Sequence, residues 1–397
     1  MSSLPVASPL PATTADAATP ADAATTADAA TMAGPGTPEG TGARRRYRIA
    51  MFSYGLPCPG EKRGGIEQVA HDLANALVDR GHVVTVFTYD PRPDTARYAT
   101  GPLPFRAFVH TWFGRRATMG YLGNVFALGP GYRDADVVIA HGDSLLLPLC
   151  GRPVIRIMQG TALQEARSAT SIGRAILQSG VYVQEILTSL CQRATVAGSV
   201  NTTHYHPFIR RVIPNGIDME RFRPEPRARS ANPSILFVGA LTGRKRGQWL
   251  LDRFDTEIRR AYPDAELHMV TPAGPAVPGV TYHTGLPVDA LVRLYQSCWV
   301  YASPSTYEGF GLPYVEAMAC GTPVVATPNP GSLEVTDDGR YGCLAADEAF
   351  IEAVIRLLGD EGERRRLGRE GLVRARDYDI ARTASRYEDV IREILGA

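Results

Sequence analysis

The sequence predicts an α/β protein built from two doubly wound domains, each a parallel sheet covered by helices. Two successive series of apolar runs alternate with helical periodicity, the first from Tyr47 and the second from Pro233. Most runs are apolar at consecutive positions, as strands are when helices cover both faces of a sheet. A Pro- and Gly-bearing hinge, VIPNGIDMERFRP, lies between the two series at 212–224. The expected parts are an N-terminal domain at 46–215, a C-terminal domain at 216–378 and a final helix at 379–397.

Residues 1–45 have a different composition from the rest of the chain. The motif ADAAT occurs at 15–19, 21–25 and 27–31, and no aromatic residue precedes Tyr47. Such a segment cannot bury enough apolar surface to offset the entropy lost on ordering, so we expect a disordered tail. A signal peptide is not expected, because no basic residue precedes Arg44 and the segment contains no Leu/Val-rich run.

The first series begins with the apolar run YRIAMFS and continues through further short runs and two helical patterns. The strands are expected at 47–53, 82–88, 136–140 and 153–158, and the helices at 66–78 and 172–190. The second series follows the same plan and leads to an amphipathic helix at the C-terminus. Its strands are expected at 234–241, 265–270, 280–285, 299–303 and 323–327, and its helices at 248–261, 289–297 and 378–395. In such sheets, ligands bind at the carboxyl ends of the strands, and the cleft between two domains is the expected site.

The overall charge argues against a polyanionic partner. Lys and Arg number 42 against 41 Asp and Glu, which excludes nucleic acid as an expected partner. No apolar run approaches the ~18 residues of a membrane span, so we expect no stable membrane insertion. Peripheral association stays open through the segment 105–133, which mixes aromatic residues with arginines. Six scattered cysteines without a C-x-x-C pair predict free thiols in a reduced compartment, the cytoplasm.

The most informative segment is SPSTYEGFGLPYVEAMACGTPVVATPNPGSLEV, at 303–335. Glu308 and Glu316 bracket a glycine-bearing loop and a short helix, with Pro313 in its first turn. The loop leads backbone N–H groups into a helix N-terminus, which favours anions. This arrangement suits a ligand with a central phosphate and hydroxyl-rich ends, such as a nucleotide sugar.

Other nucleotide-binding motifs are absent or incomplete. GLPCPGEK at 55–62 has the glycine spacing of a P-loop, but Glu61 stands where lysine is required. No G-x-G-x-x-G follows the first strand, which weakens a dehydrogenase interpretation. Asp337 and Asp338 are adjacent rather than alternating, so we expect no Asp-x-Asp metal site and no metal ion.

Four motifs together resemble the family-4 glycosyltransferases of GT-B fold, in which two Rossmann-like domains face a central cleft and a C-terminal helix crosses back. These motifs are E-x7-E at Glu308 and Glu316, EAMACGTPVVAT, VIPNGID, and GGIE at 64–67. The resemblance runs from about Tyr47 to the C-terminus. It implies retaining transfer of a sugar from a nucleoside diphosphate, without a metal or other cofactor. The first domain would bind the acceptor and the second the nucleotide sugar.

The resemblance also implies roles for individual residues. Glu316 would hold the ribose hydroxyls, and Glu308 would contact hydroxyls of the donor sugar. Arg244 and Lys245 would clamp the diphosphate, with Arg246 as the competing candidate. The other donor-binding residues would be Gly64, Gly65, Leu286, Phe310, Gly311 and Leu312.

Two positions of the first domain complete the expected site. His141 would lie near the donor sugar and completes the catalytic set with Glu308, Arg244 and Lys245. Gln159-Gly160 stands where the family often has His-Gly, so Gln159 could instead face the acceptor.

The function expected from these residues is retaining transfer of a hexose, glucose-type or an amino sugar, from a UDP-sugar. The acceptor would be a hydroxyl of a small molecule. The Ala-, Arg-, Pro- and Gly-rich composition fits a GC-rich bacterial genome, and by association we expect an antibiotic such as an aminoglycoside. The alternatives are a glycosyltransferase for a glycolipid or cell-surface polysaccharide, a GT-B nucleotide-sugar epimerase, a phosphorylase, or a non-catalytic binding protein.

Overall fold

The computed structural model describes residues 45–57, 65–102, 130–142, 144–167 and 171–396. Residues 46–397 form one compact unit, separate from residues 1–45. The predicted tail, Gly64 and most of the segment 105–133 therefore lie outside the described residues. The predicted domain boundaries within the compact unit stay a prediction.

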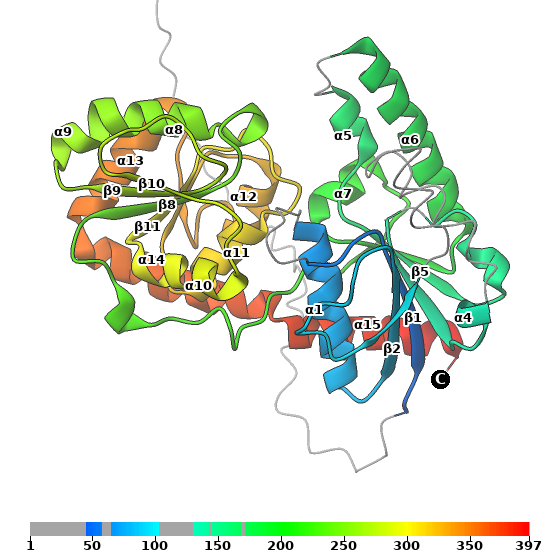
Figure 1. The fold of residues 1–397 in the computed structure, drawn as a ribbon. Coiled ribbons are helices and arrows are strands. Elements are labelled where there is room, and N and C mark those ends of the chain that lie inside the picture. The colour runs from blue at the N-terminus through cyan, green and yellow to red at the C-terminus, as the bar shows by residue number, and fades with distance from the viewer. Residues whose placement is uncertain (1–44, 58–64, 103–129, 143, 168–170, 397) are drawn as a thin grey trace, which may run out of the picture. The chain divides into compact units, whose positions relative to one another are not determined.

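The first sheet is entirely parallel, with the strand order β3-β2-β1-β4-β5-β6-β7 (Figure 1). Its strands are β1 Arg48–Ser53, β2 Val83–Thr88, β3 Ala99–Pro102, β4 Val137–His141, β5 Val154–Met158, β6 Ala194–Ala197 and β7 Arg211–Val212. The four predicted strands are present. The other three were missed because each has four residues or fewer, too short for a pattern of its own.

The helices of the first sheet connect its parallel strands. They are α1 Gly65–Asp79, α4 Pro130–Arg133, α5 Ala162–Arg167, α6 Ile172–Cys191 and α7 Val200–Tyr205, with a 3₁₀ turn at Leu147–Cys150. Both predicted helices, α1 and α6, are confirmed within two residues at each end. The side chain of Ser171 caps α6 by accepting a hydrogen bond from the N–H of Arg174.

The second sheet repeats the strand order of the first, as β10-β9-β8-β11-β12-β13. Its strands are β8 Ser234–Val238, β9 Glu266–Val270, β10 Val280–His283, β11 Val300–Ser303, β12 Val324–Ala326 and β13 Cys343–Leu344. In both sheets the order in which successive strands are added therefore reverses between the first and fourth strands, which are β1 and β4 in one sheet and β8 and β11 in the other. Such a switch point opens a crevice at the carboxyl edge.

Most helices of the second sheet follow the predicted pattern. They are α8 Gly247–Arg253, α9 Arg259–Ala261, α10 Val288–Ser297, α11 Leu312–Ala319, α12 Pro330–Thr336, α13 Asp347–Gly359 and α14 Glu361–Ala375. A π-helical turn at Phe254–Ile258 joins α8 to α9, so the predicted helix at 248–261 is one helical stretch. The 3₁₀ turns are Pro226–Ala228, Gly243–Lys245 and Arg376–Tyr378.

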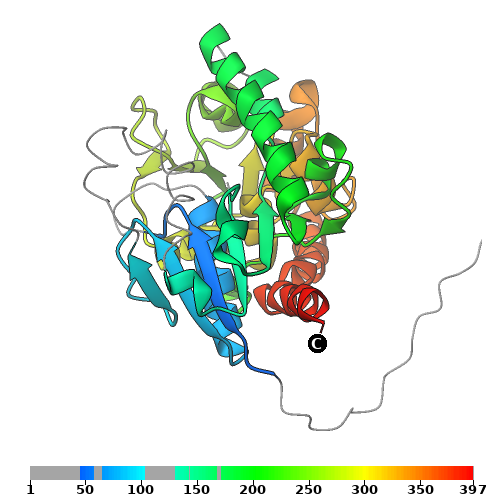
Figure 2. The same cartoon turned by 90° about the vertical axis from the view of Figure 1, so that its right-hand side faces the viewer.

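The last helix, α15 at Ile380–Leu395, crosses back to the first sheet as predicted (Figures 1 and 2). Its buried residues Ala384, Tyr387 and Ile391 belong to the same hydrophobic core as strands β1 and β2. Ile217 fixes the start of this crossing, since its N–H donates to Tyr378 O at 2.8 Å and its carbonyl accepts from the N–H of Ile380 at 2.9 Å.

Within the described part of the chain, no helix combines the length and apolarity needed to cross a membrane. The five described cysteines are free thiols, and Cys191 is exposed rather than buried. The predicted location in the cytoplasm stays a prediction.

Candidate functional site

The loops that follow β8 and β11 meet at the switch point of the second sheet. Both strands end at the same edge because they run parallel. The N–H of Thr306 donates to Arg244 O at 2.9 Å, which ties the two loops together. This contact brings the predicted basic residues next to the loop that carries Glu308.

Glu308 is buried, and two cations compensate its charge. Lys245 Nζ lies 2.6 Å from Oε1, and Arg244 Nη1 lies 2.9 Å from Oε2. Burial would raise the pKa of Glu308, but the charges of Lys245 and Arg244 outweigh it, and the pKa is lowered. The carboxylate is therefore ionised at neutral pH and holds both cations at the switch point.

Arg246, the competing candidate, has other partners. Its guanidinium makes two hydrogen bonds to Asp347, at 2.7 and 2.6 Å, and lies 4.6 Å from the ring centre of Trp249. Its backbone has φ 55°, in the left-handed region, whereas Arg244 and Lys245 lie in the 3₁₀ turn before it. The geometry favours the predicted pair over Arg246.

The glycine-bearing loop ends at α11 as predicted. Gly311 is the N-cap, with φ 90°, and Leu312 and Pro313 open the helix. A Cβ on Gly311 would meet the ring of Tyr314 at 2.3 Å. The side chain of Phe310 is buried edge-on against Tyr378, so only its backbone is available to a ligand. Pro313 has no N–H and the N–H of Tyr314 donates to Gly311 O at 2.9 Å, so the backbone donor that the start of α11 can offer an anion is the N–H of Leu312.

Glu316 lies on α11, half-buried, and accepts a hydrogen bond from Tyr295 Oη at 2.7 Å. Burial raises the pKa of Glu316 to about 7, against the opposing effects of this hydrogen bond and the charge of Lys245. The Lys245 ammonium thus acts on both carboxyl groups of the motif. Sequence reasoning missed Tyr295, because its buried position on α10 is that of an ordinary core residue.

His141 is the last residue of β4, at the switch point of the first sheet, and is fully buried. Neither ring nitrogen has a hydrogen-bond partner among the described residues. Burial lowers the pKa of His141 to about 4, so the ring is neutral at physiological pH. Buried polar groups are nearly always satisfied, which makes this imidazole a candidate for ligand contact.

The remaining predicted positions lie at loops on the carboxyl edges of the strands. A Cβ on Gly65, at the start of α1, would meet Leu312 Cδ1 at 2.9 Å, so these two predicted residues are neighbours. Leu286 is half-buried and follows β10 after Gly285. Gln159 Oε1 accepts a hydrogen bond from Asn215 Nδ2 at 2.7 Å, which links it to the predicted hinge.

The described residues contain no cluster of three or more His, Cys, Asp or Glu side chains that could hold a metal ion. The charge at the switch point is instead supplied by Arg244, Lys245 and the N-terminus of α11. The predicted independence of metal stays a prediction.

Two family models match this chain. The model described as "Glycosyltransferase Family 4" matches residues 63–221, and that described as "Glycosyl transferases group 1" matches residues 232–360. Together they cover every strand of the two sheets except β1.

Two curated relatives are mycobacterial mannosyltransferases. The MMP α-(1→4)-mannosyltransferase of Mycolicibacterium hassiacum is 33% identical over 61% of this chain and 60% of that protein. The GDP-mannose-dependent α-(1-6)-phosphatidylinositol monomannoside mannosyltransferase of Mycolicibacterium smegmatis is 32% identical over 37% of this chain and 46% of that protein. The chain thus spans about half the length of these relatives.

Among solved structures, sucrose-phosphate synthase from Thermosynechococcus elongatus has a TM-score of 0.70. It covers 88% of this chain and 100% of its own, at 21% identity. At this identity the likeness concerns the fold alone, and it confirms the predicted GT-B architecture.

Proposed function

The chain belongs to glycosyltransferase family 4, and we propose that it transfers mannose from GDP-mannose to a hydroxyl group of a membrane glycolipid. Both relatives are mannosyltransferases, which supports mannose as the sugar, and one of them is GDP-mannose-dependent and acts on a phosphatidylinositol mannoside, which supports the donor and the lipid acceptor. It replaces the expected UDP-sugar and antibiotic acceptor with the glycolipid alternative.

The proposal is based mainly on the charged cluster at the switch point, which consists of Arg244, Lys245 and Glu308. Glu308 forms ion pairs with both cations, at 2.9 and 2.6 Å, and its single charge balances only one of them. A diphosphate that reaches the cations replaces the carboxylate as their partner, and Glu308 is then free to accept hydrogen bonds from sugar hydroxyls. The N-terminus of α11 adds the backbone N–H of Leu312 as a donor for the diphosphate.

The transfer step builds negative charge on the β-phosphate as the bond between the sugar C1 and the phosphate oxygen breaks. One preorganised donor at such a position contributes about 3 kcal/mol to transition-state stabilisation, and Arg244 and Lys245 supply two without a metal. The acceptor hydroxyl bonds to C1 from the leaving-group face, and its proton passes to the departing phosphate oxygen. GDP leaves, and the α configuration is retained.

The neutral imidazole of His141 is suited to a hydroxyl of the donor sugar, since it can donate one hydrogen bond and accept another. Glu316 is suited to the ribose hydroxyls, which donate to a carboxylate. These roles follow the family resemblance, and the buried, unpartnered state of His141 among the described residues supports the first of them.

The test is a transfer assay on the full chain with GDP-mannose, UDP-glucose and UDP-N-acetylglucosamine against a detergent-dispersed phosphatidylinositol mannoside. We expect an α-mannoside from GDP-mannose, identified by NMR. Lys245→Ala should lower kcat by about a hundredfold, because a donor to the leaving phosphate is lost. Arg246→Gln is the matched control and should retain kcat.

Four results would contradict the proposal. Transfer only from a UDP-sugar would overturn the donor, and a β-linked product or a trapped glycosyl-enzyme would overturn same-face transfer. A 2-epimer of the donor formed without acceptor would identify an epimerase instead.

A further inference from the structure

Helix α6 carries an exposed apolar stripe along its length. The exposed fractions are Ile172 81%, Ile176 69%, Val183 56%, Leu187 52% and Leu190 64%. These positions follow helical spacing, with successive steps of four, seven, four and three residues, so they share one face. An apolar face of this length on an exposed helix is unusual for a surface that meets only water.

The second half of α6 is packed on the face opposite the stripe. Glu185 accepts hydrogen bonds from the N–H of Ala162 at 3.1 Å, and Tyr182 Oη donates to Tyr205 O at 2.8 Å. Arg156 Nη1, from β5, donates to Glu185 O at 2.6 Å and to Ser189 Oγ at 2.8 Å. Over this half the stripe is therefore a surface separate from the packed face, while most of residues 172–180 are exposed.

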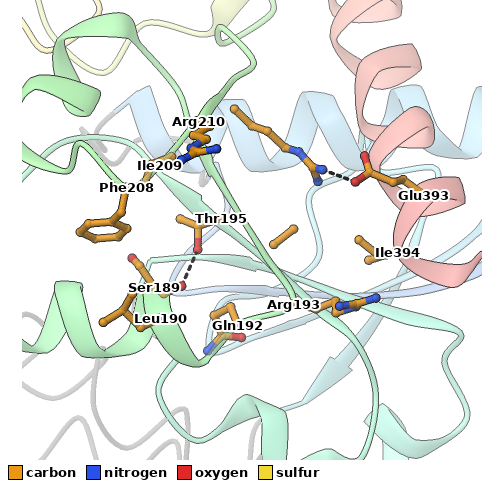
Figure 3. Close-up of a pocket in the computed structure, with 12 residues that line it drawn as sticks. Ser189, Leu190, Gln192, Arg193, Thr195, Phe208, Ile209, Arg210, Glu393 and Ile394 are labelled. Carbon is orange, nitrogen blue, oxygen red and sulfur yellow. Dashed lines mark hydrogen bonds and ion pairs between the residues drawn. The ribbon is translucent and has the colours of Figure 1, made fainter.

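The C-terminal end of the stripe leads to a basic rim. An open pocket of about 360 Å³ lies there, at the amino end of β6, and Figure 3 shows Leu190 and Phe208 beside it. Arg193 and Arg210 also line it, are exposed, and form no ion pair with any described residue. The third arginine, Arg211, pairs with Glu393.

This pocket is not the donor site. It opens at the amino end of β6, whereas His141 and the Glu308 cluster lie at the carboxyl ends of their strands. Its lining combines apolar side chains with uncompensated positive charge, as in surfaces that meet both acyl chains and lipid phosphates.

We propose that the α6 stripe, with Arg193 and Arg210 at its end, docks the protein on the surface of a bilayer that contains anionic phospholipid. Apolar side chains on one helix face enter the boundary between headgroups and acyl chains, and basic residues beside them attract anionic lipid. The suggestion that docking brings the protein to its acceptor rests on the proposed glycolipid acceptor.

Charge favours a bilayer over a second copy of the chain. The only charged residues of α6 are Arg174 near its start and Glu185, which is turned inward. A second copy paired through its own stripe would supply no acidic partner for Arg193 and Arg210, since Glu185 is turned inward. An anionic lipid surface supplies that partner at the basic end of the stripe.

The position of α6 suits delivery of a lipid acceptor. The helix packs along α5, which begins three residues after Gln159, and Figures 1 and 2 show the α5–α6 pair extending beyond the carboxyl edge of the first sheet. A docked stripe therefore places the loop after β5 close to the membrane surface, on the edge where His141 lies.

The experiment is co-sedimentation of the full chain with vesicles of phosphatidylcholine, with or without about 30% phosphatidylglycerol. We expect binding to the anionic vesicles that weakens with salt. Val183→Ser with Leu187→Ser should weaken binding at least about tenfold, because two apolar side chains no longer enter the bilayer. The matched control, Leu149→Ser with Val373→Ser, removes two equally exposed apolar side chains elsewhere and should bind as wild type.

A second pair of variants tests the basic rim. Arg193→Gln with Arg210→Gln should weaken binding to anionic vesicles about 25-fold, at roughly fivefold for each charge. Arg340→Gln with Arg365→Gln removes two exposed arginines of the second sheet's helices and loops, and should change binding far less.

Several outcomes overturn the docking surface. They are unchanged binding of the Val183–Leu187 variant, equal binding to neutral and anionic vesicles, and a wild-type dimer in sedimentation equilibrium that this variant abolishes. Mannose transfer in detergent without vesicle binding refutes the docking and leaves the proposed function intact. Vesicle binding lost in the variant, without any sugar transfer, upholds the docking and refutes the function.

Discussion

At the level of single residues, the candidate site depends on charge compensation. Glu308 is ionised although buried, because Arg244 and Lys245 contact it directly. Glu316 contacts no cation among the described residues and is hydrogen-bonded to Tyr295, so the effect of burial is the largest and its pKa rises. The two acids of one motif therefore differ in protonation near neutral pH, which gives the second a measurable signature.

We predict that donor affinity depends on the ionisation of Glu316. With a pKa of about 7, the carboxyl is neutral below that pH and accepts hydrogen bonds from ribose poorly. The dissociation constant of GDP-mannose, measured by calorimetry, should rise by up to tenfold for each pH unit below about 7 and level off above it. Glu316→Gln should bind weakly at every pH, without this slope.

The raised pKa of Glu316 also affects folding stability, and this effect has the opposite pH dependence to the donor affinity. Because the folded-state pKa lies above the ordinary value of 4.5, folding favours the protonated form. This contribution to the free energy of unfolding is complete below pH 4.5 and is lost as the pH rises to about 7.

The affinity prediction has its own contradicting outcome. A pH-independent affinity of the wild-type protein for GDP-mannose would refute the assignment of Glu316 to the donor.

At the level of elements, the loop before α11 depends on one backbone conformation. Gly311 has φ 90° and lies against the ring of Tyr314, which is itself fully buried. This conformation directs the chain from β11 into α11 and orients the N–H of Leu312. A side chain at Gly311 would oppose it both through strain and through contact.

We predict that Gly311→Ala lowers the free energy of unfolding by about 2 kcal/mol or more, since left-handed strain and a 2.3 Å contact both oppose the new methyl group. Donor affinity should fall as well, because the N-terminus of α11 shifts. Urea unfolding and calorimetry are the measurements. Gly309→Ala, two residues earlier, meets its nearest neighbour at 3.6 Å and should lose little stability. Equal effects of the two variants would contradict this account.

At the level of the whole molecule, Glu388 on α15 fastens the last helix to the first sheet. It accepts two hydrogen bonds from Arg80 at 2.6 Å, and His82 Nε2 lies 2.8 Å from it. His82 Nδ1 in turn accepts from the N–H of Tyr47, at the start of the sheet. Residues more than 300 positions apart are thereby joined across the whole folded chain.

We predict that Glu388→Ala lowers the free energy of unfolding by about 2 kcal/mol, because Arg80 and His82 lose a buried partner. Burial raises the pKa of Glu388, but the hydrogen bonds from Arg80 and His82 outweigh it, and the pKa is lowered. This stabilisation is present above the ordinary pKa of 4.5 and is lost as the pH falls through the lowered value. Urea titrations at pH 7 and at about pH 4 would measure both effects.

The control for the interaction of Glu388 with Arg80 and His82 is Glu393→Ala on the same helix. Its ion pair with Arg211 is exposed, and such pairs contribute about 1 kcal/mol or less. A loss from Glu393→Ala as large as that from Glu388→Ala would show that the helix, rather than this network, is the source of the effect.

Local patterns were sufficient for most of the fold. The apolar runs at β1, β4 and β11 and the long periodic helices α1, α6 and α15 were predicted correctly, since each carries enough residues to show its period. Short strands such as β6 and β7 carry no such signal, because pairing with neighbours defines them. The helices α12 to α14 were not predicted, and α14 has a largely charged sequence whose apolar positions are few.

The amino-acid sequence by itself determined the family and the composition of the donor motif. E-x7-E, the glycine loop and the basic triplet are each short, contiguous motifs, and a contiguous motif can be recognised without knowing the fold. Three matters depended on distant parts of the chain coming together. They are which of the neighbouring basic residues holds Glu308, how far burial moves the pKa of Glu316 beside Tyr295, and that no element among the described residues covers one face of α6. Burial and pairing are properties of three-dimensional neighbours, and sequence spacing does not report them.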